Sequence, residues 1–312
     1  MIELVLGLIL LVLGGDVLVR HSSALAIKAE VPPLIVGLTV VSICTSSPEL
    51  FASLQAVYDG VEGIAVGNVI GSNIANLGLA LGLTTLIAPL VIDDARVLKI
   101  DLPLMVMVTV MFGILANDGS FSRYDGAILM SGLVAYLWFM VRRAMKMKDQ
   151  SAIEDVKESS LIAKKSYLYL VTCIVVGCSL LYFGSETFIK GASKVMVSLG
   201  VSELVIGVTV VAFGTSVPEI VASVMAALKK EGDLGIGNLI GSNIMNILLV
   251  LGGSAIGKEI EVESSVMKFD FPFMLGTAVL LYPIIKIGKG ISRIEGAIYV
   301  SCYLAFIYFT LV

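Results

Sequence analysis

Apolar residues in this chain fall in long blocks rather than in the spaced stripes of water-soluble helices. Ten blocks run approximately over residues 2–19, 34–57, 64–91, 102–117, 124–141, 167–188, 204–227, 234–256, 271–285 and 294–312. A helix that crosses a bilayer needs about 20 mostly apolar residues. The pattern therefore predicts an all-α polytopic membrane protein with ten transmembrane helices. The first block carries Glu3 and lacks a basic leading region, so we expect a span and not a cleaved signal peptide.

The composition excludes a water-soluble globule. Hydrophobic residues make up 57% of the 312 residues, charged residues only 15%, and the mean hydropathy is +0.99. An average soluble domain carries about 25% charged residues. The net charge of −4 comes without a basic stripe, so nucleic acid is not an expected partner. The expected surroundings are the lipid bilayer, and no obligatory protein partner is indicated.

Cysteine and histidine offer little chemistry here. The single histidine is His21, which leaves no material for a histidine-ligated metal site or a Ser/His dyad. No nucleotide motif is present, so we expect neither an enzyme nor a cofactor. Buried thiols are expected in place of a disulfide framework, because all four cysteines lie inside apolar blocks: Cys44, Cys173, Cys178 and Cys302.

The longest polar stretch, 142–165, divides the chain into two parts of five blocks each, 1–141 and 166–312. We interpret the stretch as a solvated cytoplasmic linker loop. With ten spans and an external N-terminus, the loops on the cytoplasmic side hold 16 of the 21 Lys and Arg residues. Cytoplasmic loops of membrane proteins are enriched in these residues. The pattern thus predicts a protein of the cell membrane with both termini extracellular.

The two parts are copies of each other at an offset of 170 residues. Residues 34–50 and 204–220 are identical at nine of seventeen positions, and residues 67–76 and 237–246 at eight of ten. Five spans are an odd number, so the second copy must insert upside down relative to the first. Two inverted repeats are typical of secondary transporters, whose site lies near the bilayer midplane. A duplicated structural bundle is the alternative, but the identities cluster on polar residues, which packing does not require.

Oxygen-bearing residues form one stripe on the second span of each copy. Their spacing of three, four and seven residues places them on one face of a helix. The two stripes are Ser42, Thr45, Ser46 and Glu49, and Ala212, Thr215, Ser216 and Glu219.

A proline precedes the glutamate in each stripe. Pro48 and Pro218 lack an N–H and should break or kink the helix, which frees the carbonyl groups of Cys44 and Gly214. At membrane depth a freed carbonyl needs another partner. A bound cation is one such partner, and a neighbouring hydroxyl is the other.

The third and eighth spans add polar residues at i, i+4 and i+8, which again share one helix face. The neighbouring Asn73 and Asn243 are expected to form hydrogen bonds between helices. The two sets are Asn68, Ser72 and Asn76, and Asn238, Ser242 and Asn246.

Glu49 and Glu219 are the acidic residues deepest in the predicted spans. A charged side chain at the bilayer centre costs at least about 2.5–3.5 kcal/mol, so it marks a functional site. Two such carboxylates repel each other and need protons or cations between them. Carboxylates, hydroxyls, amides and carbonyls are hard oxygen ligands that suit Ca²⁺. Sodium is a hard cation of similar size, so one cage could hold either ion in turn.

These motifs are similar to the paired repeats of the sodium/calcium exchanger family, in its compact prokaryotic form. The resemblance rests on residues 45–49 with 67–74, and on residues 214–219 with 237–244. It implies a Na⁺/Ca²⁺ antiporter that works by alternating access, with spans 1 and 6 sliding as a gate. It also implies a central cation site made by Glu49, Glu219, Thr45, Thr215, Ser46, Ser216, Ser72, Ser242, Asn76 and Asn246, with the backbone carbonyls of Ser42 and Ala212.

Two residues depart from the family pattern. The family often has an aspartate where this chain has Asn246, so the site holds one acid fewer. Cys44 replaces the glycine that is usual before the first Thr-Ser pair.

Other functions remain open at this point. A proton-coupled cation exchanger of the same superfamily would use the same carboxylates and would take H⁺ as the coupling ion. A passive cation channel could use the same polar midplane, although inverted repeats with broken helices argue against it. An intramembrane protease with paired carboxylates is the third class, and the Thr-Ser cation ligands disfavour it.

Overall fold

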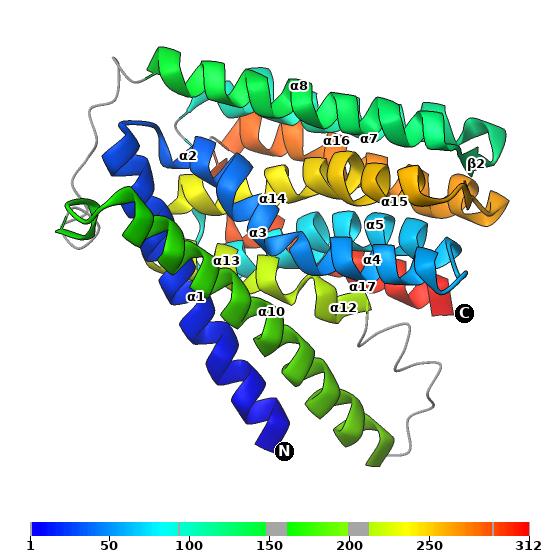
Figure 1. Cartoon of the computed structure of the whole chain (residues 1–312), viewed down its shortest axis with the longest axis horizontal. Coiled ribbons are helices and arrows are strands. Elements are labelled where there is room, and N and C mark those ends of the chain that lie inside the picture. The colour runs from blue at the N-terminus through cyan, green and yellow to red at the C-terminus, as the bar shows by residue number, and fades with distance from the viewer. Residues whose placement is uncertain (1, 93, 148–160, 199–211, 289, 312) are drawn as a thin grey trace.

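The computed structural model describes every residue except 1, 93, 148–160, 199–211, 289 and 312 (Figure 1). The first half contains α1 (Ile2–Ala29), α2 (Pro33–Val36), the π-helical turn η1 (Gly37–Val41), α3 (Ser42–Thr45), α4 (Ser47–Tyr58), α5 (Gly63–Ala75), η2 (Asn76–Leu81), α6 (Gly82–Ile87), β1 (Leu90–Val91), η3 (Val97–Asp101), α7 (Leu102–Leu115), η4 (Ala116–Asp118), β2 (Ser120–Phe121) and α8 (Arg123–Met147). The second half contains α10 (Tyr167–Ser198), α12 (Ala212–Thr215), α13 (Val217–Leu228), α14 (Gly232–Met245), η6 (Asn246–Leu251), α15 (Gly252–Gly257), β3 (Ile260–Glu261), η7 (Val266–Asp270), α16 (Phe271–Gly288), β4 (Gly290–Ile291) and α17 (Arg293–Leu311).

The protein is an all-helical, multi-pass membrane protein. In the described part of the chain, seven helices are long and apolar enough to cross a bilayer. An eighth is added if the bent pair Pro33–Thr45 and Ser47–Tyr58 counts as one span. The predicted block 204–227 falls partly outside the described residues, and α13 covers its second part.

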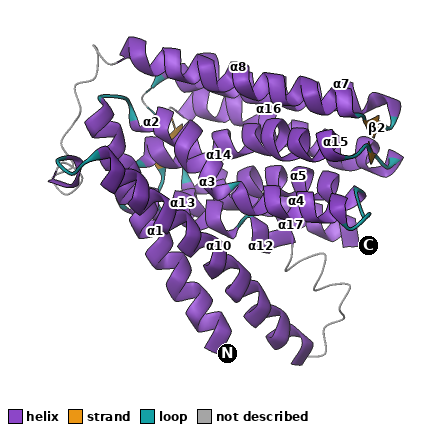
Figure 2. Ribbon diagram, viewed as in Figure 1, coloured by secondary structure: helices purple, strands orange, loops and turns teal. Residues whose placement is uncertain are grey.

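The helices recur at the 170-residue offset of the sequence repeat. For example, η2 begins at Asn76 and η6 at Asn246, and β1 begins at Leu90 and β3 at Ile260. The strands also join the two halves, since β1 pairs with β4 and β2 with β3, both antiparallel. Figure 2 shows the two strand pairs towards opposite ends of the bundle. Each half therefore supplies one strand to each end of the molecule.

Two long helices stand apart from the main bundle. Helices α1 and α10 lie side by side and are inclined to the other helices (Figure 1). Glycines bring their backbones together: a Cβ atom on Gly14 would lie 2.8 Å from the backbone nitrogen of Leu181, and one on Gly184 would lie 2.9 Å from that of Leu11. Small residues allow such close approach of membrane helices. The glycines thus make α1 and α10 a tightly packed pair.

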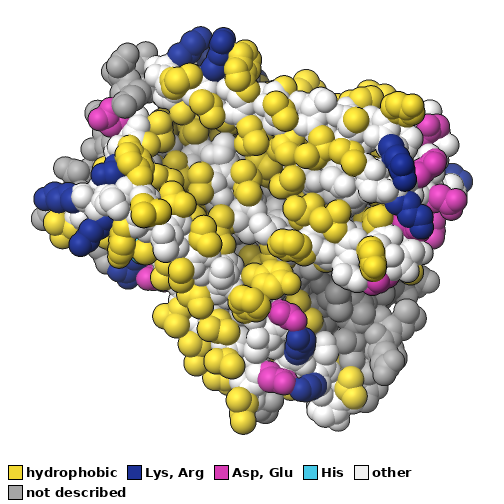
Figure 3. Space-filling model, viewed as in Figure 1, with side chains coloured by type: hydrophobic (Ala, Val, Ile, Leu, Met, Phe, Trp, Pro, Cys, Tyr) yellow, Lys and Arg dark blue, Asp and Glu magenta, His cyan; other side chains and the backbone are white. Residues whose placement is uncertain are grey.

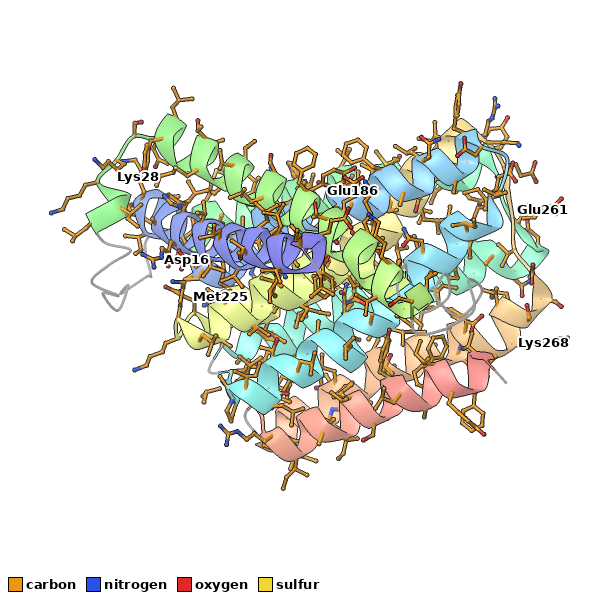
Figure 4. All side chains as sticks on the ribbon, turned by 90° about the horizontal axis from the view of Figure 1, so that it is seen from below. Asp16, Lys28, Glu186, Met225, Glu261 and Lys268 are labelled. Atoms are coloured by element: carbon orange, nitrogen blue, oxygen red, sulfur yellow. A yellow bond between two sulfur atoms is a disulfide. The ribbon has the colours of Figure 1, made fainter. Side chains whose placement is uncertain are left out.

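The surface matches a bilayer environment. Hydrophobic side chains cover much of the face in Figure 3, and charged side chains gather mainly towards its two ends, with a smaller group over α1 and α10. In Figure 4, Lys28 lies at one end of the molecule, whereas Glu261 and Lys268 lie at the other.

Helix α8 extends beyond the predicted span and includes the first residues of the polar stretch 142–165. Arg143 in this extension is only 7% exposed and forms a two-pronged ion pair with the fully buried Asp101 of η3. Residues 148–160 of the stretch lie outside the described residues. The Arg143 charge therefore belongs to the packed interior of the helical bundle.

The expectation of four buried thiols is wrong for one pair of cysteines. Cys44 of α3 and Cys178 of α10 form a disulfide, with their Cα atoms 5.5 Å apart. Cys173 and Cys302 are free. The two cysteines are 134 residues apart in the sequence, so no local pattern predicts their pairing. The disulfide forms because α10 passes beside the end of α3. The bond links the α1–α10 pair to the main bundle.

Candidate functional site

Each stripe helix breaks two residues before its proline. Ser46 lies between α3 and α4 with φ −81° and ψ 3°, and Ser216 lies between α12 and α13 with φ −86° and ψ 0°. Pro48 and Pro218 occupy the first turn of the helix that follows, where a missing N–H costs nothing. The first break bends the span by 40°. Of the two freed carbonyls, that of Gly214 accepts a hydrogen bond from the Ser185 hydroxyl of α10, so here the partner is a neighbouring hydroxyl.

The breaks place two carboxylates at the centre of the protein. Glu49 and Glu219 lie in the first turns of α4 and α13, and both are 0% exposed. Ser72 Oγ donates to Glu49 Oε1 at 3.5 Å, and Ser46 Oγ donates to Glu219 Oε1 across the two halves at 3.4 Å. Among the described residues, no Lys, Arg or His forms an ion pair with either carboxylate.

The cluster holds most of the unpartnered polar atoms of the interior. In the described part of the chain, nine buried side-chain nitrogen and oxygen atoms lack a hydrogen-bond partner. A buried polar atom without a partner costs about 1–3 kcal/mol, so such atoms call for a ligand. Six of the nine belong to the predicted site: Glu49 Oε2, Glu219 Oε2, Ser216 Oγ, Asn246 Oδ1, and both amide atoms of Asn76.

The two threonines of the stripes are held across the halves. Thr45 Oγ1 donates to Asn238 Oδ1 at 3.0 Å and lies 3.2 Å from Ser242 Oγ. Thr215 Oγ1 donates to Asn68 Oδ1 at 3.3 Å. Asn68 and Asn238 thus support threonines from the opposite half.

Two serines that hold these asparagines were not among the residues predicted from the sequence. Asn68 Nδ2 donates to Ser53 Oγ at 2.9 Å, and Asn238 Nδ2 donates to Ser223 Oγ at 3.0 Å. Both serines are 0% exposed. They stand four residues after the stripe glutamates, so extending each stripe by one helical turn would have identified them.

The structure brings most of the predicted site residues together. Ser42 is buried, and its carbonyl accepts the Ser46 N–H at 2.9 Å. Ala212 is the first residue of α12, and its side chain lies outside the described part. Asn73 bonds between helices as predicted, but the Asn243 side chain donates to Leu239 of its own helix. The remaining members of the cluster are buried, except the half-buried Thr215: Thr45, Ser46, Ser72, Asn76, Ser216, Ser242 and Asn246, with Glu49 and Glu219.

The chemistry of this donor set is that of a hard cation site. The described residues contain no group of three or more His, Cys, Asp or Glu side chains placed so that they could hold a metal ion together. The donors are two carboxylates with hydroxyl and amide oxygens. Such oxygens suit Ca²⁺ and similar hard cations, and they do not suit soft transition metals.

Comparison with known proteins identifies the class of protein. The profile of the sodium/calcium exchanger protein family matches residues 1–142 and 169–312. The chain therefore belongs to the sodium/calcium exchanger family, which is a family of transporters and not of enzymes.

Individual relatives agree over nearly the whole length. The inner membrane protein YrbG of Escherichia coli is 36% identical over 279 residues, covering 89% of this chain and 86% of YrbG. The sodium/calcium exchanger MaX1 of Methanosarcina acetivorans is 31% identical and covers 97% of this chain and 96% of MaX1. A structure of the sodium-calcium exchanger NCX_Mj, soaked with 10 mM Na⁺ and zero Ca²⁺, superposes with a TM-score of 0.83 at 32% identity and covers 98% and 97% of the two chains.

Proposed function

We propose that this protein exchanges Na⁺ for Ca²⁺ across the cell membrane by alternating access. The observation that carries the proposal is the pair of fully buried carboxylates, Glu49 and Glu219, which have no cationic partner among the described residues and one unpartnered oxygen each. Two like charges in a dry interior are costly, and bound cations remove that cost. The family membership supports cation and Ca²⁺ exchange by the same centre.

In this proposal Ca²⁺ binds between the two carboxylates, and Na⁺ ions compete for the same oxygens. Glu49 and Glu219 carry two negative charges and balance one Ca²⁺ or two Na⁺. If a third Na⁺ binds, one net charge moves per cycle, which is worth about 2.3 kcal/mol per 100 mV. The full set of ligands comprises Glu49, Glu219, Thr45, Thr215, Ser46, Ser216, Ser72, Ser242, Asn76 and Asn246, with the carbonyls of Ser42 and Ala212.

The proposed architecture has ten spans in two inverted five-helix repeats, with both termini extracellular and residues 142–165 as a cytoplasmic linker that includes the end of α8. The recurrence of helices and π-helical turns at a 170-residue offset supports the repeat. The glycine-packed pair α1 and α10 supports a unit that moves against the other helices. Such a movement would open the centre to each side of the membrane in turn.

A proton-coupled exchanger is the second candidate. It is favoured by the same observation, because a buried carboxylate pair without a cationic partner can be neutralised by protons as well as by Na⁺. The two candidates differ only in the ion that drives Ca²⁺.

The test is radiolabelled Ca²⁺ uptake into proteoliposomes loaded with Na⁺ and diluted into Na⁺-free buffer at constant pH. We expect uptake that needs internal Na⁺ and is lost in Glu49→Gln. Glu261→Gln, at the end of the molecule, serves as a control and should keep its uptake. Normal uptake in Glu49→Gln would refute the site. Uptake that does not depend on internal Na⁺ but is driven by an imposed pH gradient would identify the protein as a proton-coupled exchanger.

A further inference from the structure

The two central asparagines are equivalent in the sequence repeat, but the protein holds them differently. Asn246 Nδ2 donates to Asn73 Oδ1 at 3.1 Å, and Asn246 Oδ1 is buried without a partner. In Asn76, both amide atoms are buried without a partner. One amide is therefore fixed in its orientation, and the other is not.

The orientation of Asn73 itself follows from its surroundings. Its amide nitrogen donates to the backbone oxygen of Asn243 at 3.3 Å and contacts Met274 Sδ at 3.6 Å. Neither of these atoms can donate a hydrogen bond, so the NH₂ group of Asn73 must face them. Its oxygen consequently faces Asn246, and it can only accept. Asn246 must then present its own NH₂ group to Asn73.

From this arrangement we infer that Asn73 is a positioning residue that turns the amide oxygen of Asn246 towards the bound cation. The inference rests on the cation site proposed above. An amide has one oxygen acceptor and one NH₂ donor, and only the oxygen can bind a cation. If Asn246 rotated by half a turn, it would direct two N–H donors at the ion. Asn73 prevents that rotation without touching the ion.

The second half of the protein supplies a natural control. Asn243 is the repeat equivalent of Asn73, but its Nδ2 donates to the carbonyl of Leu239 in its own helix at 2.7 Å. Asn76 has no partner at either amide atom, so Asn243 does not hold it. The protein thus combines one fixed amide ligand with one that can rotate to fit the ion.

The experiment is a comparison of Ca²⁺ uptake kinetics in two backgrounds. In the parent protein, Asn73→Ala should raise the KM for Ca²⁺ about tenfold, which is the loss of one hydrogen bond, with kcat little changed. Asn243→Ala should leave KM unchanged. In an Asn246→Asp background, Asn73→Ala should not raise KM, because a carboxylate presents an oxygen whichever way it turns. A residue that served only for packing would raise KM equally in both backgrounds.

Each outcome decides the inference. An equal rise of KM in both backgrounds, or no rise in either, overturns it. If Asn73→Ala does not assemble, Asn73→Ser carries the same expectations, because its hydroxyl is too short to reach the Asn246 amide. Failure of the proposed function is distinguishable, since it would appear as normal uptake in Glu49→Gln.

Discussion

Reduction of the Cys44–Cys178 disulfide should accelerate exchange, because this bond ties α10 to the helix break beside the proposed cation site. The two Cα atoms are 5.5 Å apart, and disulfides tolerate Cα separations of about 4.4–6.8 Å. The bridge therefore lets α10 move away from α3 by only about 1.3 Å. A shift by one helical turn is about 5.4 Å. The oxidised protein cannot make such a shift at this point of contact.

Ca²⁺ uptake into Na⁺-loaded proteoliposomes, with and without dithiothreitol, measures the effect. A cavity of about 510 Å³ is lined by both cysteines, Ser47 and Tyr182, so a small reductant can reach the bond. We expect slow uptake before reduction and fast uptake after it. Cys178→Ser should be fast under both conditions. Cys173→Ser is the matched control on the same helix, because Cys173 is free, and it should still respond to the reductant.

Equal uptake rates before and after reduction would refute the reasoning, provided that the mass of the alkylated protein proves the bond open or closed in each sample. That result would mean that α10 and α3 do not separate during transport. The moving unit would then have to include the first helix break, and the proposed α1–α10 gate would be wrong.

Three further predictions concern the buried charges. Arg143→Met should lower the free energy of unfolding by about 3–5 kcal/mol, because it leaves Asp101 unpaired in the interior; the double variant with Asp101→Asn should recover most of the loss in thermal melts. Burial raises the pKa of Glu231, in the turn before α14, above its ordinary 4.5, so its ionisation destabilises the folded state as pH rises through that range. Glu231→Gln should then be more stable than the parent at neutral pH and equal to it at acid pH. Protons should compete with cations for Glu49 and Glu219, so uptake that stays constant from neutral to mildly acidic pH would contradict ionised ligands.

The sequence predicts best the features that depend on local patterns, although the described part of the chain has seven or eight candidate spans and the number of ten stays a prediction. The apolar blocks located the long helices, and the stripe spacing identified side chains that share a face. The two prolines predicted the helix breaks, and the structure places the breaks at Ser46 and Ser216. Even Ser53 and Ser223 were one helical turn away from the stripes. These features follow from helix periodicity and from the missing N–H of proline, and both can be read along the chain.

Contacts between segments that are far apart in the chain could not be predicted from the sequence. The bond between Thr45 and Asn238 and the disulfide at Cys44 depend on how the halves dock. The π-helical turns that begin at Asn76 and Asn246 also left no signal, although such turns are frequent at functional sites. A periodic stripe defines a face of one helix, but it does not say which atoms of the opposite half will meet that face.

Helix α10 contacts both helix breaks. These contacts suggest how movement of the proposed α1–α10 gate could depend on whether a cation is bound. Near the first break it is joined to Cys44 through Cys178. At the second break Ser185 bonds to the carbonyl of Gly214, and a Cβ atom on that glycine would lie only 2.1 Å from Ile189 Cδ1. Both carboxylate-bearing helices begin directly after these breaks, so a displacement of α10 changes the contacts of both at once. Under the proposed function, a cation that draws the two helices together would therefore favour some positions of α10 over others, and that difference would couple binding to movement.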